Sequence, residues 1–158
     1  MKVIYNSKTG FVKRYAEWIA QEIGCSVQAY HDSTSLDGLV IFCSRVHVGK
    51  VEHLNKVKQR TNNLVVVAVG ATPMAASVTI EQLWVNNNVK DIPHFYLQGG
   101  LSYERMGFLD RVIMKVFARM MKGIKTEEEA GLAEAIQRSY DISSKEYIAP
   151  VVDYLKGS

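Results

Sequence analysis

Short runs of consecutive apolar residues alternate along this chain with longer stretches in which apolar residues recur every three or four positions. The runs are typical of strands buried in a parallel sheet, and the periodic stretches are typical of amphipathic helices. Strands are predicted at Lys2–Asn6, Cys25–Tyr30, Leu39–Cys43, Leu64–Val69 and His94–Gln98. The helices between them are predicted at Val12–Ile23, Val51–Arg60 and Ile80–Asn88. This alternation indicates an α/β fold with helices on both faces of a parallel sheet.

The chain after the last predicted strand does not lead directly into a final helix. A glycine-rich turn at Gly99–Tyr103 precedes an amphipathic segment at Phe108–Lys122, and an acidic helical segment follows at Thr126–Arg138. A last helix is predicted over Ser144–Lys156, and Pro150 lies inside it. Because proline fits the first turn of a helix but not its interior, this helix either kinks at Pro150 or begins just before it.

The length and composition are those of one globular domain. The chain has 158 residues, of which 47% are hydrophobic and 22% charged, and domains typically have about 100–150 residues. We expect a core sheet in residues 1–100, an extension in residues 101–142 and a C-terminal helix in residues 143–158. Cys25 and Cys43 fall in predicted strands, where they are expected to be small buried hydrophobic residues and not a disulfide or a metal pair.

The N-terminal segment is not expected to be a targeting signal. Lys8, Lys13 and Arg14 interrupt it, whereas a secretory signal contains an uninterrupted apolar stretch. No apolar run elsewhere approaches the ~20 residues that cross a bilayer. Together with the cysteine usage, these observations predict a cytoplasmic protein.

The first predicted strand leads through the turn Ser7–Gly10 directly into the first helix. Such a turn presents backbone N–H groups, and the helix dipole adds about half a positive charge, so it can bind a phosphate without a basic side chain. The glycine patterns of mononucleotide-triphosphate and dinucleotide loops are both missing from the sequence. The alternative is an ordinary strand–turn–helix segment without a ligand.

This segment resembles the signature of flavodoxins, in which an apolar pair and an aromatic residue precede [Ser/Thr]-x-x-Gly-x-Thr-x-x-x-Ala-x-x-aliphatic. The matching residues are Val3, Ile4, Tyr5, Ser7, Gly10, Ala16 and Ile19. Val12 stands where the family usually has threonine, which removes one hydroxyl donor but leaves the backbone N–H. The resemblance implies FMN as cofactor and a flavodoxin-like sheet of five strands in the order 2-1-3-4-5.

The resemblance also implies that FMN is bound by the loops after the first, third and fourth predicted strands. The expected cofactor-binding residues are Ser7, Lys8, Thr9, Gly10, Phe11, Val12, Ser44, Arg45, Val46, His47, Val48, Gly49, Gly70, Ala71, Thr72 and Pro73. Gly49 and Gly70 would let the backbone approach the flat flavin ring closely. No metal site is expected.

His47 is the candidate catalytic residue, and a solvated loop histidine is the alternative. A positive charge from Arg45 or His47 beside the ring would stabilise the anionic reduced flavin by an energy on the order of 1 kcal/mol, or a few tens of millivolts. Neither ring loop contains a Trp or Tyr that could stack on the flavin. The walls of the ring site would instead come from Val46, His47, Val48 and Met74.

The loop Ser44–Lys50 and the runs Phe95–Tyr103 and Leu109–Lys115 resemble one branch of the flavodoxin-domain proteins. That branch includes the flavodoxin-like protoporphyrinogen oxidase, which uses FMN and passes electrons to a quinone. The Gly-Leu-x-Tyr and Asp-Arg-x-x-Met-Lys motifs are the most specific part, because the general fold does not require them. The resemblance implies an oxidoreductase that transfers electrons between an organic or nicotinamide donor and a quinone-like acceptor.

Two other functions stay open. A non-catalytic electron carrier is the first alternative, although carriers of this family are strongly acidic and this chain has a net charge of +3. A flavin-free interaction module is the second alternative, and Val12 and the missing stacking aromatic residue favour it.

Basic residues share one face of the predicted helix Phe108–Lys122. Arg111, Lys115, Arg119 and Lys122 are spaced four, four and three positions apart. Either this face is simply solvated, or it contacts an acidic partner or the anionic headgroups at the inner face of the membrane, where a quinone is accessible. A nucleic-acid partner is not expected, because the chain has no recognised binding motif and a low overall charge.

Overall fold

The computed structural model describes residues 1–102, 104–121 and 139–157. The chain forms two compact units. One consists of Met1–Gly99 together with the C-terminal segment that begins at Ser143, and the other consists of Gly100–Ile142. The expected single domain with an extension stays a prediction.

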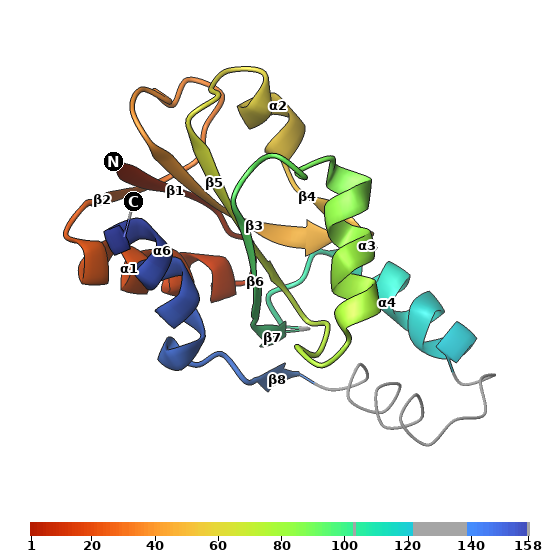
Figure 1. Cartoon of the computed structure of the whole chain (residues 1–158). Coiled ribbons are helices and arrows are strands. Elements are labelled where there is room, and N and C mark those ends of the chain that lie inside the picture. Colours follow the sequence, from red (N-terminus) through yellow and green to blue (C-terminus); the bar gives the residue numbers. More distant parts are fainter. Residues whose placement is uncertain (103, 122–138, 158) are drawn as a thin grey trace. The chain divides into compact units, whose positions relative to one another are not determined.

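The first unit is built on a parallel sheet (Figure 1). Its parallel strands are β1 (Lys2–Asn6), β2 (Ser26–Ala29), β3 (Val40–His47), β5 (Leu64–Gly70) and β6 (His94–Gln98). They lie in the order β2-β1-β3-β5-β6, and every neighbouring pair on this path is parallel. The predicted order and the flavodoxin-like α/β fold are therefore confirmed. Since the chain reverses its direction across the sheet between β1 and β3, ligands are expected at the carboxyl ends of these strands.

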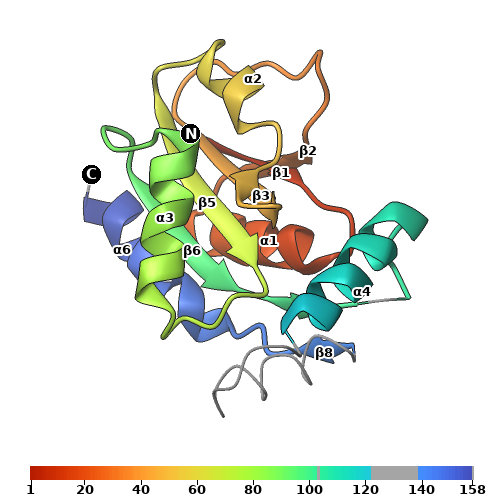
Figure 2. The same ribbon diagram turned by 90° about the vertical axis from the view of Figure 1, so that its right-hand side faces the viewer.

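Helices cover both faces of this sheet, with α1 and α3 on opposite sides of the strands (Figures 1 and 2). The face of α1 (Phe11–Ile23) also carries the 3₁₀ helix η1 (Lys145–Ile148) and α6 (Ala149–Gly157). The other face carries α2 (Leu54–Lys58) and α3 (Ser77–Asn87). Because α6 begins at Ala149, its proline occupies the first turn, where the missing N–H costs nothing.

The strands alternate their side chains between two cores, as the pleat of a sheet requires. Val3 of β1 and Ile41 of β3 pack under α1 and α6. Ile4 and Phe42, one residue further along the same strands, pack under α2 and α3. All four side chains are completely buried, which explains why the central positions of these two strands are apolar on both faces.

Strand β3 is longer than the sequence predicted, because polar residues that follow Cys43 continue the strand. Its pairing with β5 extends to Arg45 opposite Val69. The strand then turns at Val48 and Gly49, whose φ angles of 47° and 69° are both positive. Two positive φ angles are the requirement of the tight two-residue hairpin turn that matches strand twist.

The returning strand β4 (Lys50–Val51) pairs antiparallel with β3. It occupies the place where the sequence predicted the start of the helix Val51–Arg60. That helix is therefore reduced to α2, which begins only at Leu54. The prediction was wrong here because the hairpin uses the same apolar residue, Val51, as a buried strand position.

In the described part of the second unit, two strands form an antiparallel sheet and one segment is helical. The strands are β7 (Gly100–Leu101) and β8 (Tyr140–Asp141), and the helix is α4 (Phe108–Met121). Tyr103, Lys122 and the predicted acidic helix Thr126–Arg138 lie outside the described residues. Among the helices of the described residues, none has the length and apolar character needed to cross a membrane.

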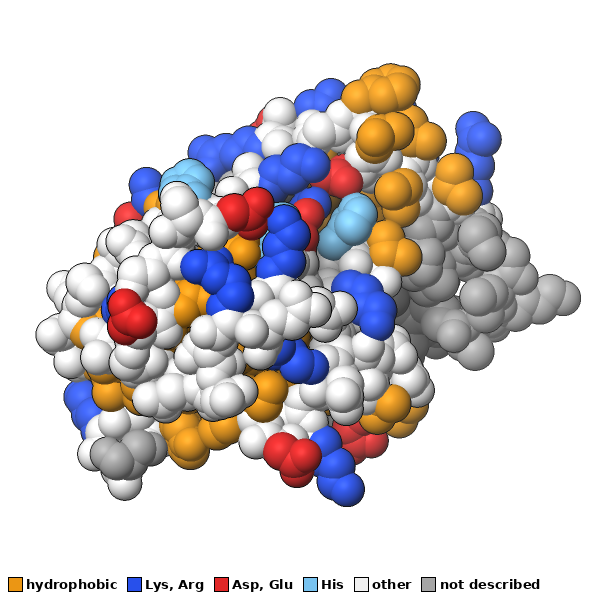
Figure 3. Space-filling view, turned by 90° about the horizontal axis from the view of Figure 1, so that it is seen from above, with side chains coloured by type: hydrophobic (Ala, Val, Ile, Leu, Met, Phe, Trp, Pro, Cys, Tyr) orange, Lys and Arg blue, Asp and Glu red, His pale blue; other side chains and the backbone are white. Residues whose placement is uncertain are grey.

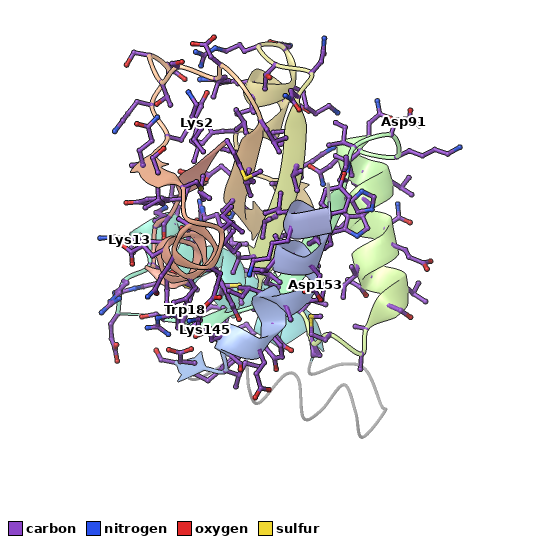
Figure 4. All side chains as sticks on the ribbon, turned by 60° about the vertical axis from the view of Figure 1, so that its left-hand side comes forward. Lys2, Lys13, Trp18, Asp91, Lys145 and Asp153 are labelled. Atoms are coloured by element: carbon purple, nitrogen blue, oxygen red, sulfur yellow. The ribbon has the colours of Figure 1, made fainter. Side chains whose placement is uncertain are left out.

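Tyr15 of α1 links three elements of the first unit. Its ring is completely buried. Its hydroxyl donates a hydrogen bond to the carbonyl oxygen of Gln98 at the end of β6 (2.5 Å) and accepts one from the Ser144 N–H just before η1 (3.2 Å). Figure 4 shows Lys145 of η1 beside α1, where its Nζ pairs with Glu22 Oε1 at 2.6 Å.

We expect Tyr15→Phe to lower the free energy of unfolding by about 1–3 kcal/mol, because the Gln98 carbonyl and the Ser144 N–H lose a partner inside the protein. Urea unfolding followed by circular dichroism measures this change. Tyr30→Phe is the matched control, since the Tyr30 hydroxyl makes only a long, exposed contact with Asp32 (3.4 Å). Equal effects of the two substitutions would show that the Tyr15 hydroxyl does not link the elements.

Candidate functional site

The turn between β1 and α1 has the geometry of an anion-binding loop. The Gly10 N–H donates to Ser7 Oγ (3.2 Å), which closes the turn. Gly10 has a φ of 96°, a conformation that favours glycine. As the N-cap of α1 it supplies no capping side chain, and the first turn of the helix contains no acidic residue. The positive end of the α1 dipole is therefore not neutralised by the cap or the first turn.

The first two side chains of α1 are buried and not exposed at this turn. Phe11 and Val12 are buried in the core under α1, in the same cluster as Val69. A Cβ atom on Gly99 would lie 3.2 Å from Phe11 Cβ and 3.1 Å from Val69 Cγ1, so the end of β6 packs tightly against the start of the helix. Both residues could therefore serve a cofactor only through their backbone N–H groups, and Val12 is foremost a core residue.

A polar cluster lies at the carboxyl ends of β1 and β3. Arg45 binds Glu52 with two hydrogen bonds, Nε to Oε2 at 2.6 Å and an Nη to Oε1 at 3.0 Å. Asn6 Nδ2 donates to the same carboxylate (2.7 Å), and it also lies 3.3 Å from Ser44 Oγ. Ser44 Oγ in turn donates to the backbone carbonyl of Glu52 (2.8 Å). These contacts join the hairpin to Asn6, the residue just before the Ser7–Gly10 turn, at the same edge of the sheet.

The pKa of Glu52 is lowered to about 2, chiefly by its hydrogen bond with Arg45 and further by that with Asn6, against the opposing effect of burial. The sequence suggested that Arg45 or His47 places a positive charge beside a flavin ring. In the structure Glu52 compensates the charge of Arg45, and the position of Arg45 near a ring stays a prediction. Sequence reasoning missed Glu52, since its contacts arise only once β4 folds back onto β3.

The residues Ser44, Arg45, Val46 and His47 were expected in an open loop, and this was wrong because they continue β3. Val46 packs partly buried against the core under α2 and α3. His47 is half-buried and lies opposite Lys50 in the hairpin. The only positions between the two strands are Val48 and Gly49, and the glycine is needed there for the turn.

The loop after β5 is held in place by side chains of β6. The Tyr96 hydroxyl donates to the carbonyl oxygen of Thr72 (2.9 Å), and the Met74 N–H donates to Gln98 Oε1 (3.1 Å). A Cβ atom on Gly70 would lie 2.8 Å from the Tyr96 hydroxyl. Packing against Tyr96 thus already requires a glycine at position 70, and close approach of Gly70, Ala71 and Pro73 to a ring stays a prediction.

Exposed apolar side chains occur at the tips of both loops. Val48 is 73% exposed in the hairpin turn, and Met74 is 45% exposed in the loop after β5. Their strands, β3 and β5, are direct neighbours in the sheet. Both loops thus present an apolar side chain at the edge of the sheet where β1 also ends.

We expect the Arg45–Glu52 pair to make stability depend on pH. Because folding lowers the pKa of Glu52 from its ordinary value of 4.5 to about 2, its stabilising effect is complete above about pH 4.5 and is lost as the pH falls toward 2. Glu52→Gln should cost about 1–2 kcal/mol at neutral pH, a figure that allows for solvent screening.

The difference in unfolding free energy between the native protein and Glu52→Gln should shrink as the pH falls from about 5 to 3. Asp32→Asn is the control, because Asp32 pairs with Lys56 on the exposed surface (3.2 Å), where we expect a much smaller effect. A Glu52→Gln difference that is constant over this range of pH would contradict the assignment.

Comparisons with known proteins place this architecture in a family. A search of curated proteins gives no match. Among solved structures, a flavodoxin from the domain Archaea matches with 13% sequence identity and a TM-score of 0.44 over 99% of each chain. A family model described as a flavodoxin domain matches residues 2–128, which include the Ser7–Gly10 turn, the β3–β4 hairpin and the loop after β5. The chain therefore belongs to the flavodoxin-domain family.

Proposed function

We propose that this protein binds FMN, with the phosphate in the Ser7–Gly10 turn, and transfers electrons as a flavodoxin-type protein. The observation that carries this proposal is the uncapped start of α1 at the edge of the sheet where β1 and β3 end. Flavodoxins typically bind FMN, and membership in their domain family supports the same cofactor here.

The residues of the turn fit a phosphate group. Gly10 brings no side chain into the space in front of the helix, and no carboxylate of the first turn would repel an anion. The Ser7 hydroxyl accepts the Gly10 N–H, and its own hydrogen can still be donated, because a hydroxyl has one donor and two acceptor positions. Backbone N–H groups and one hydroxyl suffice for an anion at a helix N-terminus.

The two ring loops fit a flat and largely apolar group. Val48 and Met74 are the exposed apolar side chains that a flavin ring would cover. FMN would supply the capacity to take up and release one or two electrons, and the protein would supply orientation and electrostatics. The compensated Arg45–Glu52 pair contributes little net charge there, so we expect it to position the hairpin more than to raise the reduction potential.

A transfer of electrons to a quinone-like acceptor is the second candidate, and it would make the protein an FMN-dependent oxidoreductase. The net charge of +3 favours it over a simple carrier, because a basic chain differs from the acidic carriers of the family. An organic substrate or a reduced nicotinamide would be the donor, and His47 is the residue to test for proton transfer. A relationship to the protoporphyrinogen oxidase branch stays a hypothesis, which is based on the Gly-Leu-x-Tyr and Asp-Arg-x-x-Met-Lys motifs.

We expect the purified protein to show the visible absorption spectrum of bound flavin, or to acquire it on titration with FMN. Gly10→Val should weaken FMN binding by at least about tenfold, since a β-branched residue is strained at a positive φ and would fill the space in front of the helix. Quenching of FMN fluorescence on titration measures the dissociation constant.

Gly24→Val is the matched control for Gly10→Val. Gly24 ends the same helix with a φ of 67°, and a Cβ atom there meets nothing within 4 Å. This variant should lose comparable stability and retain FMN affinity. Retention of full affinity in Gly10→Val, or an equal loss in both variants, would contradict a phosphate site in the Ser7–Gly10 turn.

A further inference from the structure

Helix α4 exposes a continuous row of large apolar side chains. Between 41% and 79% of each side chain is exposed. The members of this apolar stripe are Phe108, Leu109, Val112, Ile113 and Val116. Orange side chains gather over α4 in the upper right of Figure 3. Contiguous exposed apolar surface marks a site of contact with another molecule.

The stripe occupies one side of the helix. At about 100° per residue, its five members fall within an arc of about 140°. Asp110, on the opposite side, is buried, and Met114 beside it is half-buried. Within the described residues of α4, the five members of the stripe are thus exposed, whereas Asp110 and Met114 are less accessible.

Basic side chains border the stripe along one edge. Arg111, Lys115 and Arg119 are exposed. At about 100° per residue, Arg111 and Lys115 lie next to the Phe108 edge of the arc, and Arg119 lies just inside that edge. An Nη of Arg111 donates to the carbonyl oxygen of Glu104 (3.1 Å), which ties the start of this border to the preceding turn. Long basic side chains can lay their methylene groups along apolar surface and keep their charges in a polar layer.

We propose that α4 binds the surface of a bilayer that contains anionic lipids. The apolar stripe would enter the boundary between headgroups and acyl chains, and the basic border would lie among the anionic headgroups. This inference does not rest on the proposed function, because it needs neither flavin nor turnover.

Charge and shape favour this occupant over two others. In an antiparallel pairing of two α4 helices, a second copy of the chain would bring its own Arg111, Lys115 and Arg119 against the same basic border, where like charges repel. An acidic protein would need a groove that matches one protruding helix face. A bilayer accepts apolar side chains from a single helix without a shaped pocket, and the anionic headgroups complement the basic border.

Sedimentation with lipid vesicles tests the proposal, with the full chain and two vesicle compositions. One is pure phosphatidylcholine, and the other is phosphatidylcholine mixed with phosphatidylglycerol. We expect binding to the mixed vesicles, with a partition coefficient that falls as salt is raised. Replacing the three basic residues together by Gln should lower it by roughly one to two orders of magnitude.

The double variant Leu109→Glu with Val116→Glu should abolish binding, because it places two carboxylates in the stripe. The control is Val78→Glu with Val85→Glu on α3, two valines that are 78% and 72% exposed in the first unit. It adds the same charge elsewhere and should bind much better than the stripe variant. Circular dichroism verifies the fold of each variant, and the Gln variant serves if the stripe variant fails to fold.

Three outcomes would overturn the proposal. Equal sedimentation with neutral and mixed vesicles would remove the role of the basic border. Equal loss in the stripe variant and the α3 control would show a general effect of charge. Dimerisation that the stripe variant abolishes, together with no sedimentation of the native protein, would assign the face to a second copy.

Discussion

The parallel pairing of β1 with β3 is the constraint on which the site depends. Its register places Asn6, the last residue of β1, opposite Ser44, and β3 continues from there to His47, so both strands reach the same edge of the sheet. The pairing persists because each strand is apolar on both sides and has a helical layer to pack against on each face. The Ser7–Gly10 turn and the β3–β4 hairpin consequently start from the same edge, and neither could contribute to one site without that register.

The hairpin shows how a folded edge changes the chemistry of residues that look simple in sequence. From the sequence alone, Arg45 is expected to be an uncompensated cation. In the structure, Glu52, which follows β4, accepts two hydrogen bonds from it. Asn6 and Ser44 join the same carboxylate and its backbone. A paired and hydrogen-bonded charge is oriented and has little net field, so the cluster is better suited to holding a loop than to tuning a cofactor.

Helices α1 and α4 have similar apolar periodicity, but their apolar side chains differ in exposure. In α1 the apolar residues, among them Tyr15 and Ile19, are completely buried against the sheet. In α4 the arc that begins with Phe108 and Leu109 is exposed, whereas Asp110 is buried. The periodicity of apolar residues predicts that a helix has an apolar side. Whether that side is buried or exposed depends on which other elements pack against the helix.

The sequence by itself predicted the five parallel strands and the turn that precedes α1, because burial on both faces makes the centres of parallel strands apolar and a positive φ favours glycine. The order of the strands followed from the resemblance to flavodoxins. The sequence predicted Lys2–Asn6 and His94–Gln98 to the residue. The tertiary structure alone decided that β3 continues through Arg45, that Glu52 compensates its charge, and that Gly70 makes room for Tyr96. These features depend on contacts between residues distant along the chain or on backbone turns that no local pattern of apolar and polar residues specifies.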